Sequence, residues 1–524
     1  MQGKQIKWHR TLAPPLTLVY RKVDPDGTLP ESFNFPHGGK LASDNRWVMM
    51  AQLIPWSEFE SEYAQNFASS IGAPAKSFRM ALGALIIKEK LGTSDRETVE
   101  QIRENPYLQY FIGLSSYSNE IPFDASLLVH FRQRISINLV NKVNQKMVKK
   151  LREATTPQSE SNKKEPEEPS DSVLRGKLLL DATCASADIT YPTDISILDR
   201  ARMQTEKIVD ILYKSIQELC HKKPRTYRNK ARKDYLSITK QRRPSQSKKR
   251  TAIKKQLQYI KRNLSHIERL IELGANLKNL SKRQYKLLLV CHEVYRQQAW
   301  MYEHKTNKVD DRIVSLTQPH VRPIVRGKAG KHTEFGAKLS ASSFEGYVFL
   351  DRISWDNFNE SGDLIAQVEA FKKFTGHYPE SVHVDKIYRT LDNRAWCKKN
   401  GIRMSGPPLG RPPAHVSKEK KKQAAEDERV RQAIEGKFGQ AKRRFSLGRV
   451  MAKLDNTSLT AMAVTFLLMN LVAGLKRLLW VFLCQFSSVT IGCGSVIIKN
   501  YGCGIQLKQK LNLSACSNLR SNFF

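Results

Sequence analysis

Acidic residues are scarce for a chain of 524 residues. The 50 Asp and Glu stand against 87 Lys and Arg, which gives a formal net charge of +37. This excess of positive charge is typical of a protein with a polyanionic partner, and it argues against a small neutral substrate, although a membrane surface or a ribosomal role would also fit the charge alone. Hydrophobic residues make up 40% of the chain, so it is not a disordered basic tail, and its length favours two to four domains.

Cys-x-x-Cys pairs and the features of a secretory leader are also lacking, and one long apolar run is present. The eight cysteines include no Cys-x-x-Cys pair, so we expect reduced thiols in a cytoplasmic protein. Residues 1–10 are polar and no apolar segment follows them, which argues against a signal peptide. Residues 457–475 are uncharged and about long enough to span a membrane, but their polar side chains favour a buried core helix and no membrane partner: Thr457, Ser458, Thr460, Thr465 and Asn470.

The first third of the chain turns from irregular to helical. Residues 1–60 hold scattered Pro and Gly and predict an irregular lead-in. Residues 61–154 predict a helical domain for DNA binding or dimerisation, in which one apolar stripe ends at Gly92 and Ser94 caps the next helix. Residues 155–172, rich in Ser, Pro, Glu and Lys, predict a linker.

Residues 194–317 predict a basic helical insertion. We interpret Asp194 as the N-cap of its first helix, and two further helices on either side of Gly274 predict an α-helical hairpin. Between Lys222 and Arg262 seventeen basic residues face one acid, Asp234, a density that predicts contacts with phosphates rather than a solvated face. The cations that we select as DNA contacts are Lys248, Lys249, Arg250, Lys254 and Lys255.

Two short apolar segments each lead to an aspartate. Residues 177–180 predict a strand that ends at Asp181, and residues 381–384 predict a strand that ends at Asp385. Functional groups gather at the carboxyl ends of strands in open α/β sheets, so both aspartates are placed for chemistry. Between them, alternating residues from 335 to 350 predict a β-hairpin, and a helix follows it.

A third carboxylate, Glu435, lies among cations on a predicted helix. At 3.6 residues per turn it shares one face with Arg431, Phe438 and Lys442. One interpretation is a helix with i,i+4 ion pairs. The other is a site for a metal and a phosphate, in which the carboxylate holds the cation and the basic side chains hold the anion.

The order of these elements is consistent with a single metal site formed by the three carboxylates. With the basic helices set aside, it is strand (Asp181), strand, strand, helix, strand (Asp385), helix, strand, helix (Glu435). Three carboxylates can hold two divalent cations that bridge a phosphodiester. Mg²⁺ suits such a site because it prefers oxygen ligands and keeps waters.

Four motifs stand out along these elements: Leu178-Leu-Leu-Asp181-Ala-Thr, the run from Gln318 to Lys328, Val384-Asp385-Lys-Ile-Tyr388, and Arg431-x3-Glu435-x6-Lys442. With these motifs the chain resembles DDE-type insertion-sequence transposases, most closely the insertion sequence five group, over roughly residues 78–479. It departs from the family at Glu428, where Tyr is frequent, and at Ile387, where Gly is frequent.

The resemblance implies an α/β fold with an RNase H-like mixed sheet, built from residues 173–193 and 318–482, a helical N-terminal domain and the basic insertion. It also implies two Mg²⁺ ions, for which Mn²⁺ can substitute. The implied metal ligands and catalytic residues are Asp181, Asp385 and Glu435, and the implied DNA contacts are Arg431, Lys442 and Tyr388. Residues 483–524 show no sustained period and predict a low-order tail.

The activity that the resemblance implies is cleavage at the inverted-repeat ends of a mobile element and joining of the 3′-hydroxyls to target DNA. We expect a homodimer or larger oligomer on double-stranded DNA, in the cytoplasm at the nucleoid. Two alternatives stay open: a sequence-indifferent RNase H-like nuclease, and a catalytically inactive basic DNA-binding protein.

Overall fold

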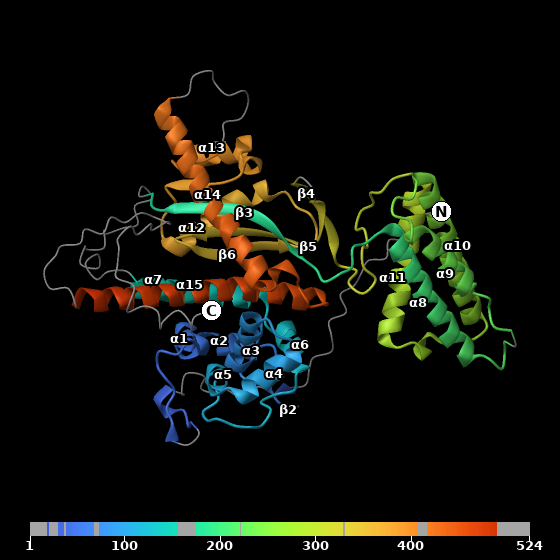
Figure 1. Cartoon of the computed structure of the whole chain (residues 1–524), viewed down its shortest axis with the longest axis horizontal. Helices are drawn as coiled ribbons and strands as arrows, with labels where there is room; N and C mark the ends of the chain where they lie inside the picture. The colour runs from blue at the N-terminus through green and yellow to red at the C-terminus, as the bar shows by residue number, and fades with distance from the viewer. Residues whose placement is uncertain are drawn as a thin grey trace. The chain divides into compact units, whose positions relative to one another are not determined.

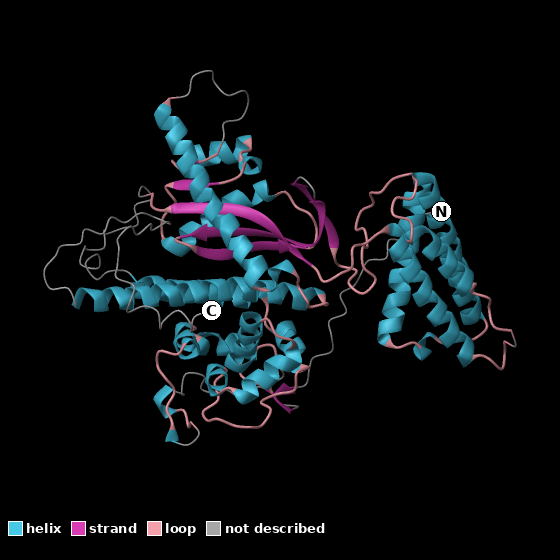
Figure 2. Cartoon of the chain, viewed as in Figure 1, coloured by secondary structure: helices cyan, strands magenta, loops and turns pink. Residues whose placement is uncertain are grey.

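The computed structural model describes most of the chain as a mixed α/β protein in which helices predominate (Figures 1 and 2). It divides into two units, Met1–Arg477 and Leu478–Phe524. The Pro-rich loop near residue 410, most of the predicted linker and most of the predicted tail fall outside the described residues. Those residues are 18–19, 30–35, 38–67, 73–155, 174–220, 222–328, 331–406 and 417–489.

Seven helices precede the large sheet in the described part of the chain. The lead-in predicted through residue 60 is wrong from Asn45 onward, because Asn45 caps α1 and two helices follow. Trp47 and Trp56 of these helices are buried against Phe111, and Pro55 between them interrupts the helical period that would have revealed them. The helices are α1 (Arg46–Leu53), α2 (Trp56–Ala64), α3 (Phe78–Leu91), α4 (Asp95–Glu104), α5 (Pro106–Phe111), α6 (Leu127–Arg134) and α7 (Ile137–Thr155).

The large sheet has six strands and mixed pairing: β3 (Lys177–Ser186), β4 (Arg322–Lys328), β5 (Lys331–Phe344), β6 (Tyr347–Ser354), β7 (Ser381–His383) and β8 (Arg403–Met404). A separate parallel pair joins β1 (Leu18–Val19) to β2 (Ala73–Pro74). In the large sheet β3 is antiparallel to β5 and parallel to β7, which is parallel to β8. Both β4 and β6 pair with β5. The predicted hairpin is confirmed as β5 and β6, whose turn places Glu345 and Gly346 at positive φ, 50° and 77°.

One glycine permits the close approach of β5 to β3. Gly336 lies opposite Ser186 at the end of their pairing, and a Cβ built on it would lie 1.9 Å from the carbonyl oxygen of Ala185. A backbone atom cannot move aside as a flexible side chain can, so no larger residue fits there. The glycine therefore lets the β3–β5 ladder run its full length.

Three helices complete the order of elements predicted around the carboxylates: α12 (Leu364–Thr375), α13 (Leu391–Lys399) and α14 (Lys418–Arg444). Once β4 and the basic helices are set aside, that order is confirmed. Gly376 ends α12 in the left-handed conformation, as the sequence predicts. Helix α14 crosses over β3 and β7 (Figure 1).

The last helix, α15 (Asp455–Val489), covers an edge of the sheet. Its segment Asp455–Trp480 is long and apolar enough to cross a membrane, but 83% of the apolar window is buried inside the structure, as expected for a core helix. Asn470 is 1% exposed; its Oδ1 accepts a hydrogen bond from the Val348 N–H at 2.9 Å, and its Nδ2 donates to the Val348 carbonyl at 2.7 Å. The Asn470 amide therefore pairs with the outer edge of β6 much as a further strand would.

Other contacts join the N-terminal helices to this edge and to α15. Asn141 and Asn144 of α7 donate to the carbonyls of Leu350 and Val348 in β6, at 3.1 and 3.4 Å. In α3, Glu89 Oε1 accepts a hydrogen bond from Thr465 of α15 at 2.6 Å. The seven helices, α15 and the sheet are therefore joined by polar contacts as well as by apolar packing.

The basic insertion forms a bundle of α8 (Asp194–Ser215), α9 (Arg228–Thr239), α10 (Gln246–Glu272) and α11 (Lys282–Glu303). The predicted hairpin of α10 and α11 is incomplete, because α8 packs against both helices and shares their apolar core. Asp194 is not the N-cap of α8. Thr193 caps the helix in a capping box with Ser196, and Asp194 instead accepts hydrogen bonds from Gln298 and Arg312.

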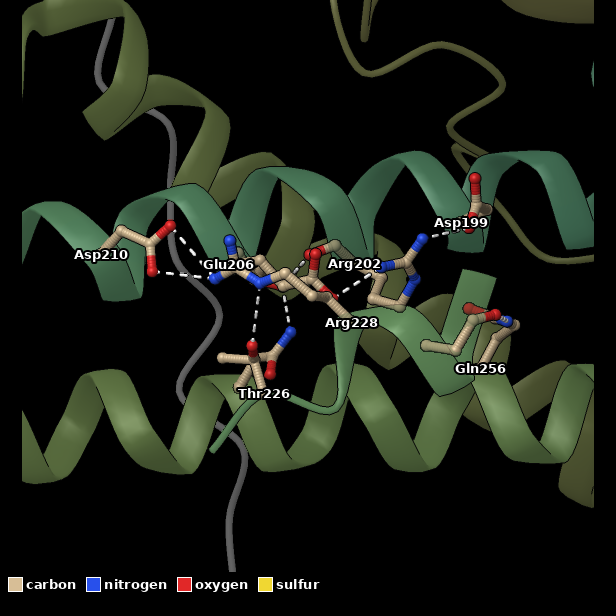
Figure 3. A network of polar contacts seen from close by, with 10 residues as sticks. Asp199, Arg202, Glu206, Asp210, Thr226, Arg228 and Gln256 are labelled. Carbon is tan, nitrogen blue, oxygen red and sulfur yellow. Dashed lines mark hydrogen bonds and ion pairs between the residues drawn. The ribbon is translucent and has the colours of Figure 1, made fainter. Parts of the chain in front are cut away.

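A polar network lies along α8 inside this bundle (Figure 3). Arg202, whose side chain is 3% exposed, donates to Asp199 at 2.5 Å and to Glu206 at 2.6 Å. Arg228 at the start of α9 donates to both carboxylate oxygens of Asp210. Buried charges are tolerated when they are paired and hydrogen-bonded, so the network joins α8 to its neighbours without a stranded charge on these groups.

Replacing Asn470 by Leu tests the edge of β6. The variant leaves the Val348 N–H without its acceptor and removes the stronger donor to its carbonyl, so we expect the free energy of unfolding in urea to fall by about 2–5 kcal/mol. Asn141→Leu removes a single half-buried hydrogen bond from the same strand and should cost only about 1 kcal/mol. Equal losses in the two variants would contradict a special role for Asn470.

Candidate active site

Asp181 lies within β3, and Asp385 follows the neighbouring parallel strand β7. The β3–β7 pairing ends with Leu179 opposite His383, two residues before each aspartate. Residues two apart point to the same face of an extended strand, and neighbouring strands are about 4.8 Å apart. The two aspartates thus follow the last paired residues at equal distances along the chain.

The prediction that the first strand ends at Asp181 is wrong. Strand β3 continues to Ser186 because it stays paired with the long strand β5. The pairing with β7 stops at Leu179, so Asp181 lies in mid-strand where β3 has lost one of its two neighbours. Asp385 follows β7 and caps a 3-10 turn, accepting a hydrogen bond from the Lys386 N–H at 2.6 Å.

Glu435 is on α14, which contacts both β3 and β7. One turn earlier, Arg431 donates to Glu435 Oε1 at 2.9 Å. The same guanidinium donates to both carboxylate oxygens of Glu428, at 2.6 and 3.1 Å. The i,i+4 ion pair expected from the sequence is thus present, and Arg431 is shared between two carboxylates.

The three carboxylates share one electrostatic environment. Burial is the main cause that raises the pKa of Asp181 to about 6. The negative charges of Glu435 and Asp385 add to this rise, whereas the Ala182 N–H and the Arg431 guanidinium oppose it. Charges act on a pKa only at limited range, so Glu435 on the helix and Asp385 after β7 both lie in the neighbourhood of Asp181; these three carboxylates are called the acidic cluster below.

This cluster fits a divalent cation by its chemistry. Its donors are carboxylate oxygens, which Mg²⁺ prefers, and a cation would offset the negative charges of Glu435 and Asp385, which add to the rise in the pKa of Asp181 that burial mainly causes. Among the described residues no three acidic, histidine or cysteine side chains converge closely enough to enclose a metal; Glu435 binds Arg431 instead. Because Glu435 is exposed, a change of its side-chain rotamer is enough to release it from Arg431.

A set of contacts that the sequence did not reveal anchors α14 to the sheet. Asp427 accepts hydrogen bonds from two nitrogens of Arg403 in β8, at 2.7 and 2.9 Å, and lies 3.7 Å from Nδ1 of the fully buried His383 in β7. Asp427 precedes Glu435 by about two helical turns. The anchor therefore helps to fix the height of Glu435 above the aspartates.

Tyr388 and Lys442, two expected DNA contacts, have different surroundings. Tyr388 is fully buried, and its burial raises its pKa, with a further rise from the charge of Asp181. A buried ring cannot reach a DNA backbone, so the prediction of a direct contact by Tyr388 is wrong. Lys442 is half-buried in the last turn of α14, and its contact with a phosphate stays a prediction.

The five cations selected in the insertion all lie on α10, but two of them have partners within the chain. Arg250 is half-buried over the ring of Tyr302, 4.5 Å from its centroid, and donates to the Tyr302 carbonyl. Lys255 pairs with Asp234 at 3.0 Å. The cations that remain exposed without an ion pair among the described residues are Lys248, Lys249 and Lys254.

Two segments of the chain match models of protein families. Residues 382–472, which include Asp385, Arg431 and Glu435, match a family described as a transposase DDE domain. Residues 37–134 match the transposase domain (DUF772). Both matches support an insertion-sequence transposase.

The matched segments also bear on individual residues and helices. Asp181 lies outside both segments, so its place in the site depends on the register of β3. The match that begins at residue 37 includes α1 and α2, in agreement with the helices found there.

A curated relative covers less of the chain. An uncharacterized protein, ORF8 in the nfe locus of Rhizobium meliloti, is 38% identical over 88 residues, which is 17% of this chain and 42% of that protein. The chain thus covers less than half of the relative's length. No solved structure matches the chain.

Replacing Tyr388 by Phe tests the corrected assignment. The ring and its packing are kept, and the hydroxyl that is lost is buried, so we expect the affinity for a random DNA duplex to change by less than about twofold, because no contact with DNA is removed. Fluorescence anisotropy measures the affinity. A loss of about tenfold or more with unchanged thermal unfolding would restore the direct DNA contact.

Proposed function

We propose that the protein is a DNA transposase that cuts at the inverted-repeat ends of its element and joins the 3′-hydroxyl ends to target DNA by two-metal phosphoryl transfer. The observation that carries the proposal is the position of Asp181 and Asp385, each two residues beyond the last paired residues of β3 and β7, together with the effect of the Asp385 and Glu435 charges on the pKa of Asp181. The strand order β6-β5-β3-β7-β8, antiparallel on one side of β3 and parallel on the other, agrees with an RNase H-like sheet.

The side chains divide the work at this site. Asp181, Asp385 and Glu435 would hold two Mg²⁺ ions, or Mn²⁺ in their place, which stabilise the attacking and leaving oxygens. Asp181 lies half-buried at the base, whereas Asp385 and Glu435 are exposed and leave the site open to a DNA strand. Arg431, kept in place by Glu428, would exchange Glu435 for a phosphate next to the cleaved bond.

The proposed reaction has two displacements at phosphorus. In the first, the oxygen of a water adds to a phosphodiester, the bond to the 3′-oxygen breaks, and the products are a 3′-hydroxyl and a 5′-phosphate. In the second, the 3′-hydroxyl attacks a target phosphodiester and one diester replaces another. Because both steps exchange an oxygen at phosphorus, one site can serve both.

The remaining parts of the chain receive roles by the same proposal. Residues 173–193 and 318–482 form the catalytic domain, and residues 194–317 contact the DNA backbone. The helical domain adds further DNA or dimer contacts; it was expected at residues 61–154 and begins at Arg46 in the structure. Lys442 adds a further DNA contact. The protein would act in the cytoplasm at the nucleoid, as a homodimer or larger oligomer on double-stranded DNA.

Amide variants test the carboxylates. Asp181→Asn, Asp385→Asn and Glu435→Gln each keep the side-chain shape but remove the charge, so Mg²⁺-dependent nicking of a supercoiled plasmid should fall by about 10²-fold or more in each. DNA affinity should survive. Asp392→Asn changes an exposed carboxylate in the first turn of α13 and should keep its nicking activity.

The outcomes separate the alternatives. Nicking near the wild-type rate in any of the three variants would remove that residue from the site. An intact chain that binds DNA but never nicks it with Mg²⁺ or Mn²⁺ would be a non-catalytic DNA-binding protein. Nicking without any joining of 3′-hydroxyl ends to a second duplex would indicate a sequence-indifferent nuclease.

A triple variant tests the insertion. In this variant three lysines are changed together to Gln: Lys248, Lys249 and Lys254. The slope of log DNA affinity against log salt concentration should become shallower by up to about 0.9 for each phosphate contact that is lost. Binding to element ends and to random DNA should weaken equally, since phosphate contacts do not read sequence.

The matched control removes three cations that form ion pairs within the chain. Lys223 and Arg228 share Asp210, and Lys255 pairs with Asp234. Two acids offset two of the three charges, so the change of these cations to Gln should alter the salt slope less. An unchanged slope in the first triple variant would leave the exposed cations as a solvated face. A loss confined to element ends would assign them to sequence recognition instead.

A further inference from the structure

An open depression of ≈ 660 Å³ lies between α13 and β8, outside the acidic cluster. Its cationic lining residues are Arg389, Arg394, Lys398 and Arg403, and its apolar lining includes Leu391 and Ile402. It starts four residues after Asp385 in the chain. Arg403 also anchors α14 through Asp427.

The cations of this depression differ in their partners. Arg403 is neutralised by Asp427. Arg394 and Lys398 are exposed one turn apart on α13, and in the described parts of the chain neither forms an ion pair. Like charges at this spacing on a helix repel each other, so the pair favours a bound anion.

Arg389 adds a third charge without an acid. Its Nη1 donates only to main-chain carbonyls, those of Met404 at 3.3 Å and Ser405 at 2.5 Å. Its Nε is buried and finds no partner among the described residues. Burial, together with the nearby charge of Arg394, lowers the pKa of Arg389. The guanidinium is therefore fixed in place while its charge is left uncompensated.

The shape and chemistry of the depression indicate its ligand. The guanidinium groups of its arginines and the ammonium group of a lysine lie on one rim, and such groups donate hydrogen bonds to the oxygens of a phosphodiester. Leu391, 77% exposed at the rim, is an apolar surface for a sugar or a base. The volume lies in the range of sites for nucleotide-sized groups. Cys397 is buried, which raises its pKa to about 11, so it offers no nucleophile.

We infer that this depression binds a backbone phosphate of the DNA at a point away from the acidic cluster. Arg389, Arg394 and Lys398 contact the phosphodiester, and Leu391 packs against the adjoining sugar or base. The inference rests on the proposed function and adds to it a second DNA contact beyond the acidic cluster. The side occupied by Arg403 takes no phosphate, because Asp427 already holds its charge.

Position-specific cross-linking tests the site in the full-length protein. Leu391→Cys is mixed with duplexes that carry a thiol tether on one phosphate at a time, in a chelator so that the acidic cluster plays no part. A disulfide should form in a narrow window of tether positions, above the background of the chain without this change. Adding Arg394→Gln and Lys398→Gln should lower the affinity for the duplex by roughly 5- to 10-fold per cation at about 0.1 M salt and abolish the window.

Two controls match the variants. Lys373→Gln on α12 with Lys453→Gln removes the same charge at two exposed positions with no proposed DNA contact and should leave the cross-linking window in place. Leu454→Cys moves the thiol to another exposed apolar position and should give no such window. Thermal unfolding of each variant checks that it is folded.

Each remaining outcome is decisive. Absence of a window, or a window that survives Arg394→Gln with Lys398→Gln, overturns the inference. Protection of Leu391→Cys from alkylation by a deoxynucleoside monophosphate but not by duplex DNA also overturns it, in favour of a site for a free nucleotide. If Asp181-dependent nicking is found but no cross-linking, the inference about the depression is wrong and the proposed function is kept. If cross-linking is found but no such nicking, the DNA contact is kept and the proposed catalysis is wrong.

Discussion

The pairing of the Asn470 amide with Val348 is the contact on which the arrangement around the sheet depends. An edge strand presents unpaired N–H and carbonyl groups that must find partners when they are covered. At β6 those partners come from side chains of α7 and α15, so two helices can lie where another strand would otherwise add. The same hydrogen bonds join the N-terminal helices to the sheet that carries Asp181.

The acidic cluster depends on an asymmetry of β3. On one side β3 keeps its antiparallel partner as far as Ser186, helped by the absence of a side chain at Gly336. On the other side its parallel partner stops just before the level of Asp181. The strand is thus held rigidly on one edge and left open on the other, so that α14 can bring Glu435 towards the gap, at a height set by Asp427.

Local patterns in the sequence predicted much of this arrangement. Left-handed glycines at Gly92 and Gly376, the turn at Glu345 and the aspartate after β7 all depend on a few neighbouring residues, and these predictions are confirmed. Three features were not predictable, because each depends on residues far away in the sequence: the length of β3, the ion pair of Arg403 with Asp427, and the hydrogen bonds of Asn470 with Val348. Tyr388 was misassigned for the same reason: the motif gives its position, but only the packing of distant elements buries it.

The position of Asn470 late in the chain has a consequence for synthesis on the ribosome. The edge of β6 is complete at Ser354, but its cover arrives only after roughly 100 further residues, on the order of 10 s at ordinary elongation rates. During that interval Asn141 and Asn144 of α7, made earlier, can cover the carbonyls of Leu350 and Val348, but the Val348 N–H waits for Asn470. A strand edge with an unpaired N–H invites pairing between neighbouring nascent chains on one messenger. A product terminated ahead of α15 keeps this N–H without its acceptor, so we expect early stop codons to yield an aggregation-prone fragment.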